Sequence, residues 1–188
     1  MRTDDKRRAA EDYATRAHFC QIFQEDAQSL YLLAFLLTAN QKNAEQCFFA
    51  SMEEALNERT VFKEQARSWS RRLVVRNAIR LIAAPSAQSQ EQPECWAEAD
   101  DESAAWMTIS AVTQLASFDR IVFVMSVLER YSEWECASLL DSRAQDVQAA
   151  RIRALQQLPA CIRPWSANAE DFRRTTEKPQ REYERSRS

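Results

Sequence analysis

Apolar residues recur at three- and four-residue spacing in six stretches of the chain, a periodicity that is typical of amphipathic helices. Before residue 85 the pattern predicts helices over 18–37, 43–57 and 62–84. After residue 103 it predicts helices over 117–128, 132–141 and 142–158, and the last of these ends just before Pro159. Helical segments are therefore expected on both sides of a stretch that lacks the pattern.

The last two predicted helices are separated by a very short turn, and each begins at a recognisable start signal. Ser132 is followed three residues later by Glu135, which predicts a capping box. Ser142 is followed three residues later by Gln145, which predicts a second one. Two short helices joined in this way are typical of a helix-turn-helix, the unit that places a recognition helix in the DNA major groove. This stretch favours a role in transcription over enzyme chemistry.

Glycine is absent from all 188 residues, where an average usage of about 7% would supply roughly a dozen. Hairpin turns, phosphate-binding loops and nucleophile elbows depend on glycine for positive φ or for close approach of the backbone. Helices can end instead at Asn, Asp or irregular turns. We therefore predict an all-α fold and expect neither a nucleotide-binding α/β fold nor a β-sandwich.

Charge is distributed unevenly along the chain and suggests two small helical domains. Residues 18–60 carry two basic and six acidic side chains, whereas residues 61–84 carry six basic and one acidic. Residues 85–103 carry six acidic side chains, no basic one and two prolines, so we interpret them as an acidic linker. The predicted organisation is an N-terminal tail (1–17), a helical domain (18–84), the linker (85–103), a helix-turn-helix domain (104–160) and a charged, disordered C-terminal tail (161–188).

The basic helix over 62–84 separates polar and apolar residues onto opposite faces. Four residues fall within about 80° of one another on a helical projection: Trp69, Arg72, Arg76 and Arg80. The opposite face carries the apolar residues Val74, Val75, Ala78, Ile79, Leu81 and Ile82. A row of arginines is most often a solvated surface. Arginines that follow phosphates beside an indole that stacks on an unpaired base are typical of single-stranded nucleic-acid binding, and both interpretations stay open at this point.

The stretch 115–140 reads LASFDRIVFVMSVLERYSEWECASLL. It is similar to a pattern of the bacterial sigma-70-type factors of the small extracytoplasmic-function group. That pattern reads leucine-proline, arginine, valine-phenylalanine, leucine-glutamate-glycine-tyrosine-serine, glutamate-isoleucine-alanine and leucine-leucine-glycine, and Val147 and residues 153–158 continue it. Residues 30–38 and 69–77 are similar to the first and the promoter-melting helices of the family. The resemblance covers roughly residues 18–84, as region 2, and 104–160, as region 4.

This resemblance implies a protein that directs or modulates transcription initiation by bacterial RNA polymerase. It implies core RNA polymerase and promoter DNA as partners, with an anti-sigma factor as a further candidate. Polymerase contacts are implied on the helix over 43–57, at Glu45, Gln46, Phe48 and Phe49. DNA contacts are implied in both domains, at Trp69, Arg72, Arg76, Asn77, Arg80, Arg143, Gln145, Gln148, Arg151 and Arg153.

The chain departs from the family pattern at both implied surfaces. The polymerase-binding helix of the family usually reads aspartate-alanine-glutamate-aspartate-leucine-valine-glutamine-glutamate, whereas residues 43–50 read NAEQCFFA. Phe48 and Phe49 lie about 100° apart on a helix, so we expect one ring to be exposed. On the recognition helix, Gln148 and Ala150 stand where the family typically has a lysine and an arginine, and Asp141 occupies the position of the turn glycine.

These departures leave two alternatives to a working sigma factor. One is a sigma mimic that binds a regulator or the polymerase without reading a promoter. The other is a plain helix-turn-helix transcriptional regulator with a helical dimerisation domain. A recognition helix with few cations favours the first alternative, because contacts to phosphates supply much of the affinity for DNA.

Few residues of the chain indicate catalysis, metal binding, disulfide formation or membrane insertion. The five cysteines, at 20, 47, 95, 136 and 161, include no Cys-x-x-Cys pair, and Cys47 and Cys136 are expected as small core residues in a reducing cytoplasm. His18 is the only histidine and lies outside any catalytic motif, and the carboxylates of Glu53 and Glu54 are interpreted as solubilising groups. No apolar run approaches the roughly 18 residues of a membrane span. We therefore expect a cytoplasmic protein with no membrane segment, no catalytic residue, no cofactor and no metal.

Overall fold

The computed structural model describes residues 12–58, 60–83 and 104–158, and within the last range it describes the side chains from residue 107 onward. The chain divides into two compact units, Met1–Asp101 and Glu102–Ser188. In the described ranges every named element is helical, which confirms the all-α prediction there. The predicted linker over 85–103 and the predicted tail over 161–188 lie outside the described residues.

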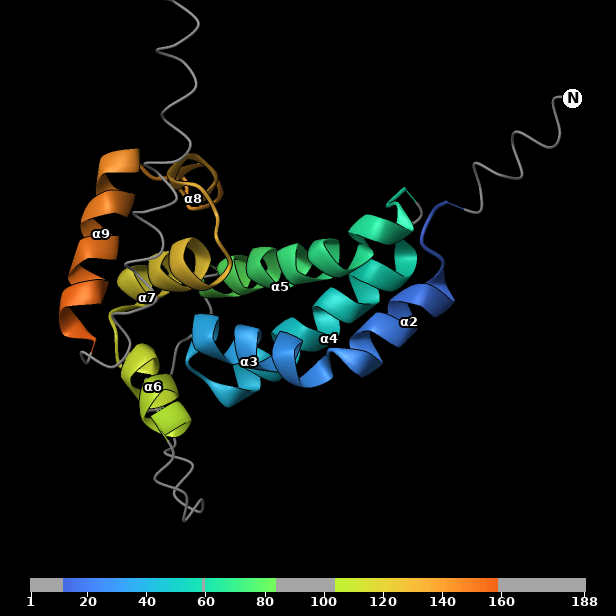
Figure 1. The fold of residues 1–188 in the computed structure, drawn as a ribbon, viewed down its shortest axis with the longest axis horizontal. Helices are drawn as coiled ribbons and strands as arrows, with labels where there is room; N and C mark the ends of the chain where they lie inside the picture. Colours follow the sequence, from blue (N-terminus) through green and yellow to red (C-terminus); the bar gives the residue numbers. More distant parts are fainter. Residues whose placement is uncertain (1–11, 59, 84–103, 159–188) are drawn as a thin grey trace, which may run out of the picture. The chain divides into compact units, whose positions relative to one another are not determined.

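The first unit is a helical bundle, coloured blue to green in Figure 1. It consists of α2 (Arg16–Glu25), α3 (Ala27–Thr38), α4 (Gln41–Asn57), a single 3₁₀ turn η1 (Lys63–Gln65) and α5 (Ala66–Ala83). Helices α4 and α5 pack against each other, and each of them also contacts α2 and α3. The largest fully buried side chains of this unit are Phe19, Leu30, Leu37, Leu73, Val74 and Val75.

The predicted helix over 18–37 is in fact two helices, which are separated at Asp26. Thr15 caps the first of them, where its hydroxyl oxygen accepts a hydrogen bond from the backbone N–H of His18 at 3.3 Å. At the break, the guanidinium of Arg67 on α5 pairs with the carboxylates of Glu25 and Asp26. The apolar periodicity continues through Asp26, so the spacing of apolar residues gives no sign of this break.

Residues 12–17 were predicted as part of a tail, but they belong to the packed unit. Tyr13 and Phe62 form an isolated antiparallel bridge, and their rings stack with centroids 4.8 Å apart. Backbone hydrogen bonds flank this bridge on both sides, from Ala14 N–H to the Val61 carbonyl at 2.7 Å and from Lys63 N–H to the Asp12 carbonyl at 2.9 Å. The chain is therefore tied to the start of η1 before α2 begins.

The second unit is coloured yellow to orange in Figure 1. It contains α6 (Ala104–Thr113), which the sequence pattern did not predict, α7 (Ser117–Phe123), a π-helical turn η2 (Val124–Leu128), α8 (Glu133–Leu139) and α9 (Ala144–Gln157). Helix α9 packs against both α7 and α8, and Figure 1 shows α8 nearly end-on while α9 runs across the view. The predicted pair of short helices joined by a tight turn is confirmed as α8 and α9.

One of the two predicted capping boxes is confirmed and the other is wrong. The Ser132 hydroxyl accepts a hydrogen bond from the Glu135 N–H at 3.2 Å, and the Glu135 carboxylate accepts one from the Ser132 N–H at 2.9 Å. Ser142 makes no such box with Gln145, because α9 begins at Ala144 and Arg143 occupies its cap position without a side-chain hydrogen bond. The N–H of Ser142 instead donates to the Ala137 carbonyl at 3.0 Å, which keeps Ser142 in the turn.

Left-handed backbone conformations occur without glycine at three described residues. They are Ala39 with φ of 51°, Arg130 with φ of 58° and Asp141 with φ of 47°. Ala39 ends α3, Arg130 precedes α8, and Asp141 lies in the turn between α8 and α9. This conformation costs roughly 1–2 kcal/mol for a residue with a β-carbon, although Asp tolerates it better than most. The expectation that Asp141 takes the place of a turn glycine is confirmed.

Candidate functional site

Four of the predicted nucleic-acid contacts lie on one face of α5, which we call the arginine face: Trp69, Arg72, Arg76 and Arg80. Arg72 and Arg80 are exposed, whereas Trp69 and Arg76 are half-buried. On the other side of α5, the side chains of Val74, Val75 and Ala78 are fully buried in the bundle. The predicted separation of polar and apolar faces is confirmed, since the buried valines fix the rotation of α5 and so turn the arginines outward.

Glu54 on α4 is the principal partner of the arginine face. Its carboxylate pairs with the guanidinium of Arg76 and lies 3.7 Å from that of Arg80. It also accepts a hydrogen bond from the side-chain amide of Asn77 at 3.2 Å. Glu54 was interpreted from the sequence as a solubilising group, and the structure shows instead that it holds two arginines. The sequence carried no local signal for this role, because the partners lie on different helices.

Asn77 was predicted as a DNA contact together with the arginines, but it lies buried beneath them and is not presented to solvent. Its side chain is only 8% exposed. Its amide nitrogen donates to the Ser51 hydroxyl at 3.1 Å as well as to Glu54, and its carbonyl oxygen lies 3.4 Å from an Arg80 nitrogen. Because its hydrogen bonds are made inside the protein, Asn77 helps to hold Glu54 and Arg80 in place.

Arg76 lies against the indole of Trp69 as well as against Glu54. The centre of its guanidinium is 5.8 Å from the centroid of the Trp69 ring, within the range of a cation–π interaction. Two buried donors at this contact have no acceptor among the described residues, the indole N–H of Trp69 and the Nε–H of Arg76. A buried donor without an acceptor costs roughly 1–3 kcal/mol.

Arg72 differs from its neighbours on the arginine face. Its side chain is exposed, and it forms no ion pair within the part of the chain that the structure describes. It is therefore the cation of this face that a phosphate could contact without displacing a carboxylate.

The predicted polymerase contacts lie on α4, and only one of its two adjacent aromatic rings is fully presented to solvent. Phe49 is 60% exposed, and Glu45 and Gln46 beside it are also exposed. Phe48 is half-buried, with its ring centroid 5.6 Å from that of Phe23 and 6.3 Å from that of Tyr31. The expectation that one of the two rings is exposed is confirmed, and the exposed ring is Phe49.

Burial and the charge of Glu45 both raise the pKa of Tyr31, which keeps its hydroxyl neutral beside this aromatic cluster.

The predicted DNA contacts of the second unit lie on or next to α9. Arg143, Gln145 and Gln148 are exposed, and Arg151 is half-buried. Arg153 does not point freely outward, because it donates two hydrogen bonds to the carboxylate of Asp119, at 3.0 and 2.7 Å. Asp119 itself is only 4% exposed, so the pair ties α9 to α7. Arg153 therefore has a structural contact, and the exposed cation next to α9 without a side-chain cap hydrogen bond is Arg143.

Three large apolar side chains of α8 and α9 are exposed, and one of them, Leu139, was expected from the apolar periodicity of its helix to be buried. Trp134 is 81% exposed, Leu139 is 40% exposed and Ile152 is 49% exposed. The exposure of Trp134 could have been predicted from the sequence. It lies two residues after the capping serine, between Glu133 and Glu135, on the polar side of α8. Exposed aromatic side chains are enriched at protein interfaces rather than at phosphate contacts.

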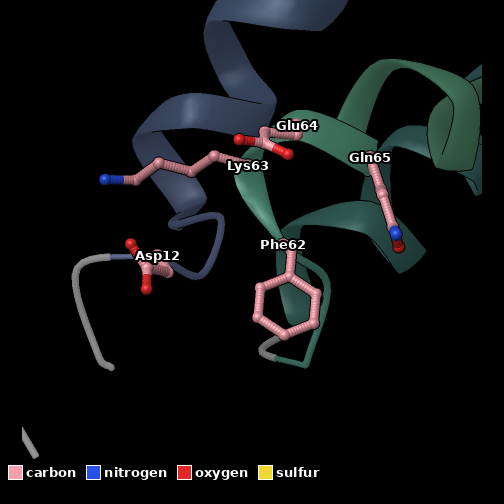
Figure 2. Close-up of a pocket in the computed structure, with 5 residues that line it drawn as sticks. All are labelled: Asp12, Phe62, Lys63, Glu64 and Gln65. Atoms are coloured by element: carbon pink, nitrogen blue, oxygen red, sulfur yellow. The ribbon is translucent and has the colours of Figure 1, made fainter. Parts of the chain in front are cut away.

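A shallow, open hollow lies at the start of η1 and is lined by Asp12, Phe62, Lys63, Glu64 and Gln65. Figure 2 shows the side chain of Lys63 extending to the left of this turn and that of Gln65 pointing downward, away from it. Side chains that diverge in this way do not form the convergent set of groups that a catalytic pocket requires. The hollow therefore gives no support to an enzyme site.

The predictions about cysteines and metal binding can be checked only for the described residues. Cys47 and Cys136 are fully buried, which confirms the prediction of small core residues. Their burial raises the pKa of each thiol to about 11. Cys95 and Cys161 lie outside the described residues. Within the described ranges, no three His, Cys, Asp or Glu side chains gather closely enough to hold a metal ion.

Comparison of the sequence with other proteins adds no family. No protein-family model matches it, and no curated protein matches it significantly. Among the described helices, none is both long enough and apolar enough to cross a lipid bilayer.

Proposed function

We propose that this protein is a sigma-factor-like DNA-binding protein that directs or modulates transcription initiation by bacterial RNA polymerase. The observation that carries the proposal is the backbone of the helix-turn-helix. The family pattern has glycine at two positions, which correspond to Arg130 and Asp141, and both residues are left-handed, with φ of 58° and 47°. Apolar periodicity alone would not require left-handed backbone at these positions. Agreement at both of them therefore supports the resemblance.

Three surfaces have roles in this proposal. The arginine face of α5 contacts single-stranded promoter DNA, with Arg72 on phosphates and Trp69 against a base. The exposed residues Arg143, Gln145 and Gln148 contact duplex DNA, because α9 is the second helix of a helix-turn-helix. The exposed side of α4, with Glu45, Gln46 and Phe49, contacts core polymerase. The protein would act in the cytoplasm, without catalysis and without a cofactor, and an anti-sigma factor is a further candidate partner.

The proposal is tested by transcription in a reconstituted system. Core polymerase is incubated with the purified full chain and a library of genomic fragments from the source organism, and RNA start sites are mapped. We expect start sites that appear only when the protein is present, and retention of core polymerase on the immobilised protein. A double variant Trp69→Ala, Arg72→Ala is expected to retain core polymerase but to lose the start sites. Absence of both core retention and start sites in the wild type would overturn the proposal.

A sigma mimic without promoter recognition is the second candidate, and a specific observation favours it. On α9 the guanidinium of Arg153 is engaged with Asp119, while α8 and α9 expose Trp134, Leu139 and Ile152. Such a surface suits a protein partner better than a phosphate backbone. Core retention without protein-dependent start sites would support the mimic. Binding of duplex DNA without core retention would instead support a plain helix-turn-helix regulator.

A further inference from the structure

Glu54 occupies the position on the arginine face that a phosphate group would be expected to take. Its carboxylate pairs with Arg76, lies 3.7 Å from an Arg80 nitrogen and accepts a hydrogen bond from Asn77 at 3.2 Å. Carboxylate and phosphate oxygens use the same guanidinium donors. Two of the three arginines of this face are therefore already paired with one carboxylate of the protein, and Arg72 is the third.

The same ion pair also covers the aromatic member of the face. With its guanidinium held by Glu54, Arg76 lies over the Trp69 ring at 5.8 Å from the centroid. A base that stacked on this ring face would have to displace the guanidinium or share the face with it. The indole N–H of Trp69 and the Nε–H of Arg76 are buried without acceptors in this arrangement, among the residues that the structure describes. The closed arrangement thus leaves two donors unsatisfied that would be available once Arg76 moved.

We propose that Glu54 holds the nucleic-acid site of α5 in a self-masked state, and that single-stranded nucleic acid binds by displacing the Glu54 carboxylate from Arg76 and Arg80. On displacement the two guanidinium groups contact phosphates, and the Trp69 ring becomes free to stack on a base. Arg72, which is not held by Glu54, makes the first phosphate contact. This inference rests on the proposed function, because it assumes that the arginine face binds nucleic acid.

The mask lowers affinity without abolishing it. Strand binding must compete with a carboxylate that is covalently part of the protein. The apparent affinity is therefore the intrinsic affinity multiplied by the fraction of molecules that are unmasked. Removing the charge of Glu54 should therefore tighten binding and add phosphate contacts. If Glu54 instead only orients the arginines for the strand, removal of its charge should weaken binding of the strand.

The test uses the full chain and a fluorescein-labelled oligothymidylate of about 20 nucleotides, which exceeds typical single-strand site sizes. Dissociation constants are measured by fluorescence anisotropy over a range of salt concentrations for the wild type, Glu54→Gln and Glu53→Gln. Glu53 is the matched control, because it is the preceding residue of α4, is exposed and loses the same charge. Circular dichroism and thermal unfolding check that each variant is folded.

We expect Glu54→Gln to bind about tenfold more tightly at low salt, as two partly exposed ion pairs would allow. The slope of log affinity against log salt should steepen by roughly 1.4, which corresponds to two added phosphate contacts on a single strand. Glu53→Gln should change affinity by less than about twofold, because among the described residues Glu53 forms no ion pair with the arginine face. Glu54→Asp retains the charge on a shorter side chain, so it should fall between wild type and Glu54→Gln, and it replaces Glu54→Gln if that variant does not fold.

Two further variants separate this inference from the function on which it rests. Trp69→Ala and Arg72→Ala should each weaken binding of the oligothymidylate in the wild-type background. If they do so while Glu54→Gln binds no more tightly than Glu53→Gln, the arginine face binds nucleic acid and the mask is refuted. If neither the wild type nor Glu54→Gln binds the strand, the arginine face is no nucleic-acid site, and both proposals fail there. Binding by Glu54→Gln alone would support both.

Discussion

The guanidinium of Arg153 on α9 donates two hydrogen bonds to the carboxylate of Asp119 on α7, at 3.0 and 2.7 Å. Asp119 is nearly inaccessible to solvent, so Arg153 supplies hydrogen bonds that water cannot. This contact raises the pKa of Arg153. A residue that seems from the sequence to face DNA therefore anchors the recognition helix.

We expect Arg153→Ala to lower the midpoint of thermal unfolding of the second unit by several degrees, because it leaves a buried carboxylate without its partner. Arg143→Ala removes an exposed arginine of the same helix-turn-helix and should leave the midpoint nearly unchanged. Circular dichroism of the full chain measures both effects. An unchanged midpoint for Arg153→Ala, combined with a loss of duplex binding, would restore Arg153 as a DNA contact.

The two adjacent phenylalanines of α4 should separate stability from partner binding. Phe48→Ala removes a half-buried ring that contacts Phe23 and Tyr31, so it should lower the free energy of unfolding by roughly 1–3 kcal/mol. Phe49→Ala removes an exposed ring and should change that free energy by less than about 0.5 kcal/mol. Chemical denaturation measures both values.

Binding of core polymerase should show the reverse order, with Phe49→Ala weakening retention on the immobilised protein. Such a loss in a variant of normal stability would mark the exposed side of α4 as the polymerase contact. If both variants fold and retain core polymerase as the wild type does, the contact lies elsewhere, and the mimic becomes the preferred interpretation.

Ala39 should be a position at which glycine stabilises the fold. Its φ of 51° is left-handed, and its N–H donates to the Phe35 carbonyl at 2.7 Å where α3 ends. Replacement by glycine relieves the clash of the β-carbon, so Ala39→Gly should raise the free energy of unfolding by about 1 kcal/mol. Ala50→Gly, inside α4, should lower it by a similar amount. Chemical denaturation measures both changes in the free energy of unfolding. If both substitutions lower it, the β-carbon of Ala39 does not destabilise the fold.

The buried thiols of Cys47 and Cys136 should make the protein less stable in alkali. Burial raises the pKa of each from an ordinary value of 9.0 to about 11, so the folded state keeps a proton that the unfolded state releases. Their contribution to stability is complete below about pH 9 and is lost as the pH rises from 9 to 11. The loss should be at most about 2–3 kcal/mol for each thiol.

The double variant Cys47→Ala, Cys136→Ala provides the control for this pH dependence, because other groups also titrate in alkali. Its free energy of unfolding should fall less steeply than that of the wild type between pH 9 and pH 11. Parallel curves for the two proteins would show that the thiols titrate alike in the folded and unfolded states.

The features that the sequence predicted correctly are those whose causes lie within a few residues. The capping box of Ser132 and Glu135 is one of them, because both partners occupy the same helical turn. The exposure of one of the rings of Phe48 and Phe49 is another, because adjacent side chains point about 100° apart on a helix. The rotation of α5 followed from its own apolar residues in the same way.

The features that could not be predicted depend on partners from other elements. The break at Asp26 is stabilised by Arg67, which the chain reaches only after three further elements. The pairing of Glu54 with Arg76 likewise joins two helices, and neither residue signals the other in the sequence. The failed capping box at Ser142 has a local cause of a different kind, since its N–H is already engaged by Ala137.

The bridge between Tyr13 and Phe62 determines where a shorter version of the first unit can begin. Together with its flanking hydrogen bonds, it joins the residues before α2 to the residues before α5, so that the two ends of the segment 13–62 lie together. A fragment that starts at His18, the boundary that charge and periodicity indicate, would lack the Tyr13 ring, the buried Ala14 and the Thr15 cap. Such a fragment would keep the helices but would lose the contacts that join the chain before α2 to the start of η1. The smallest fragment suited to measuring strand binding by the isolated unit therefore begins no later than Asp12.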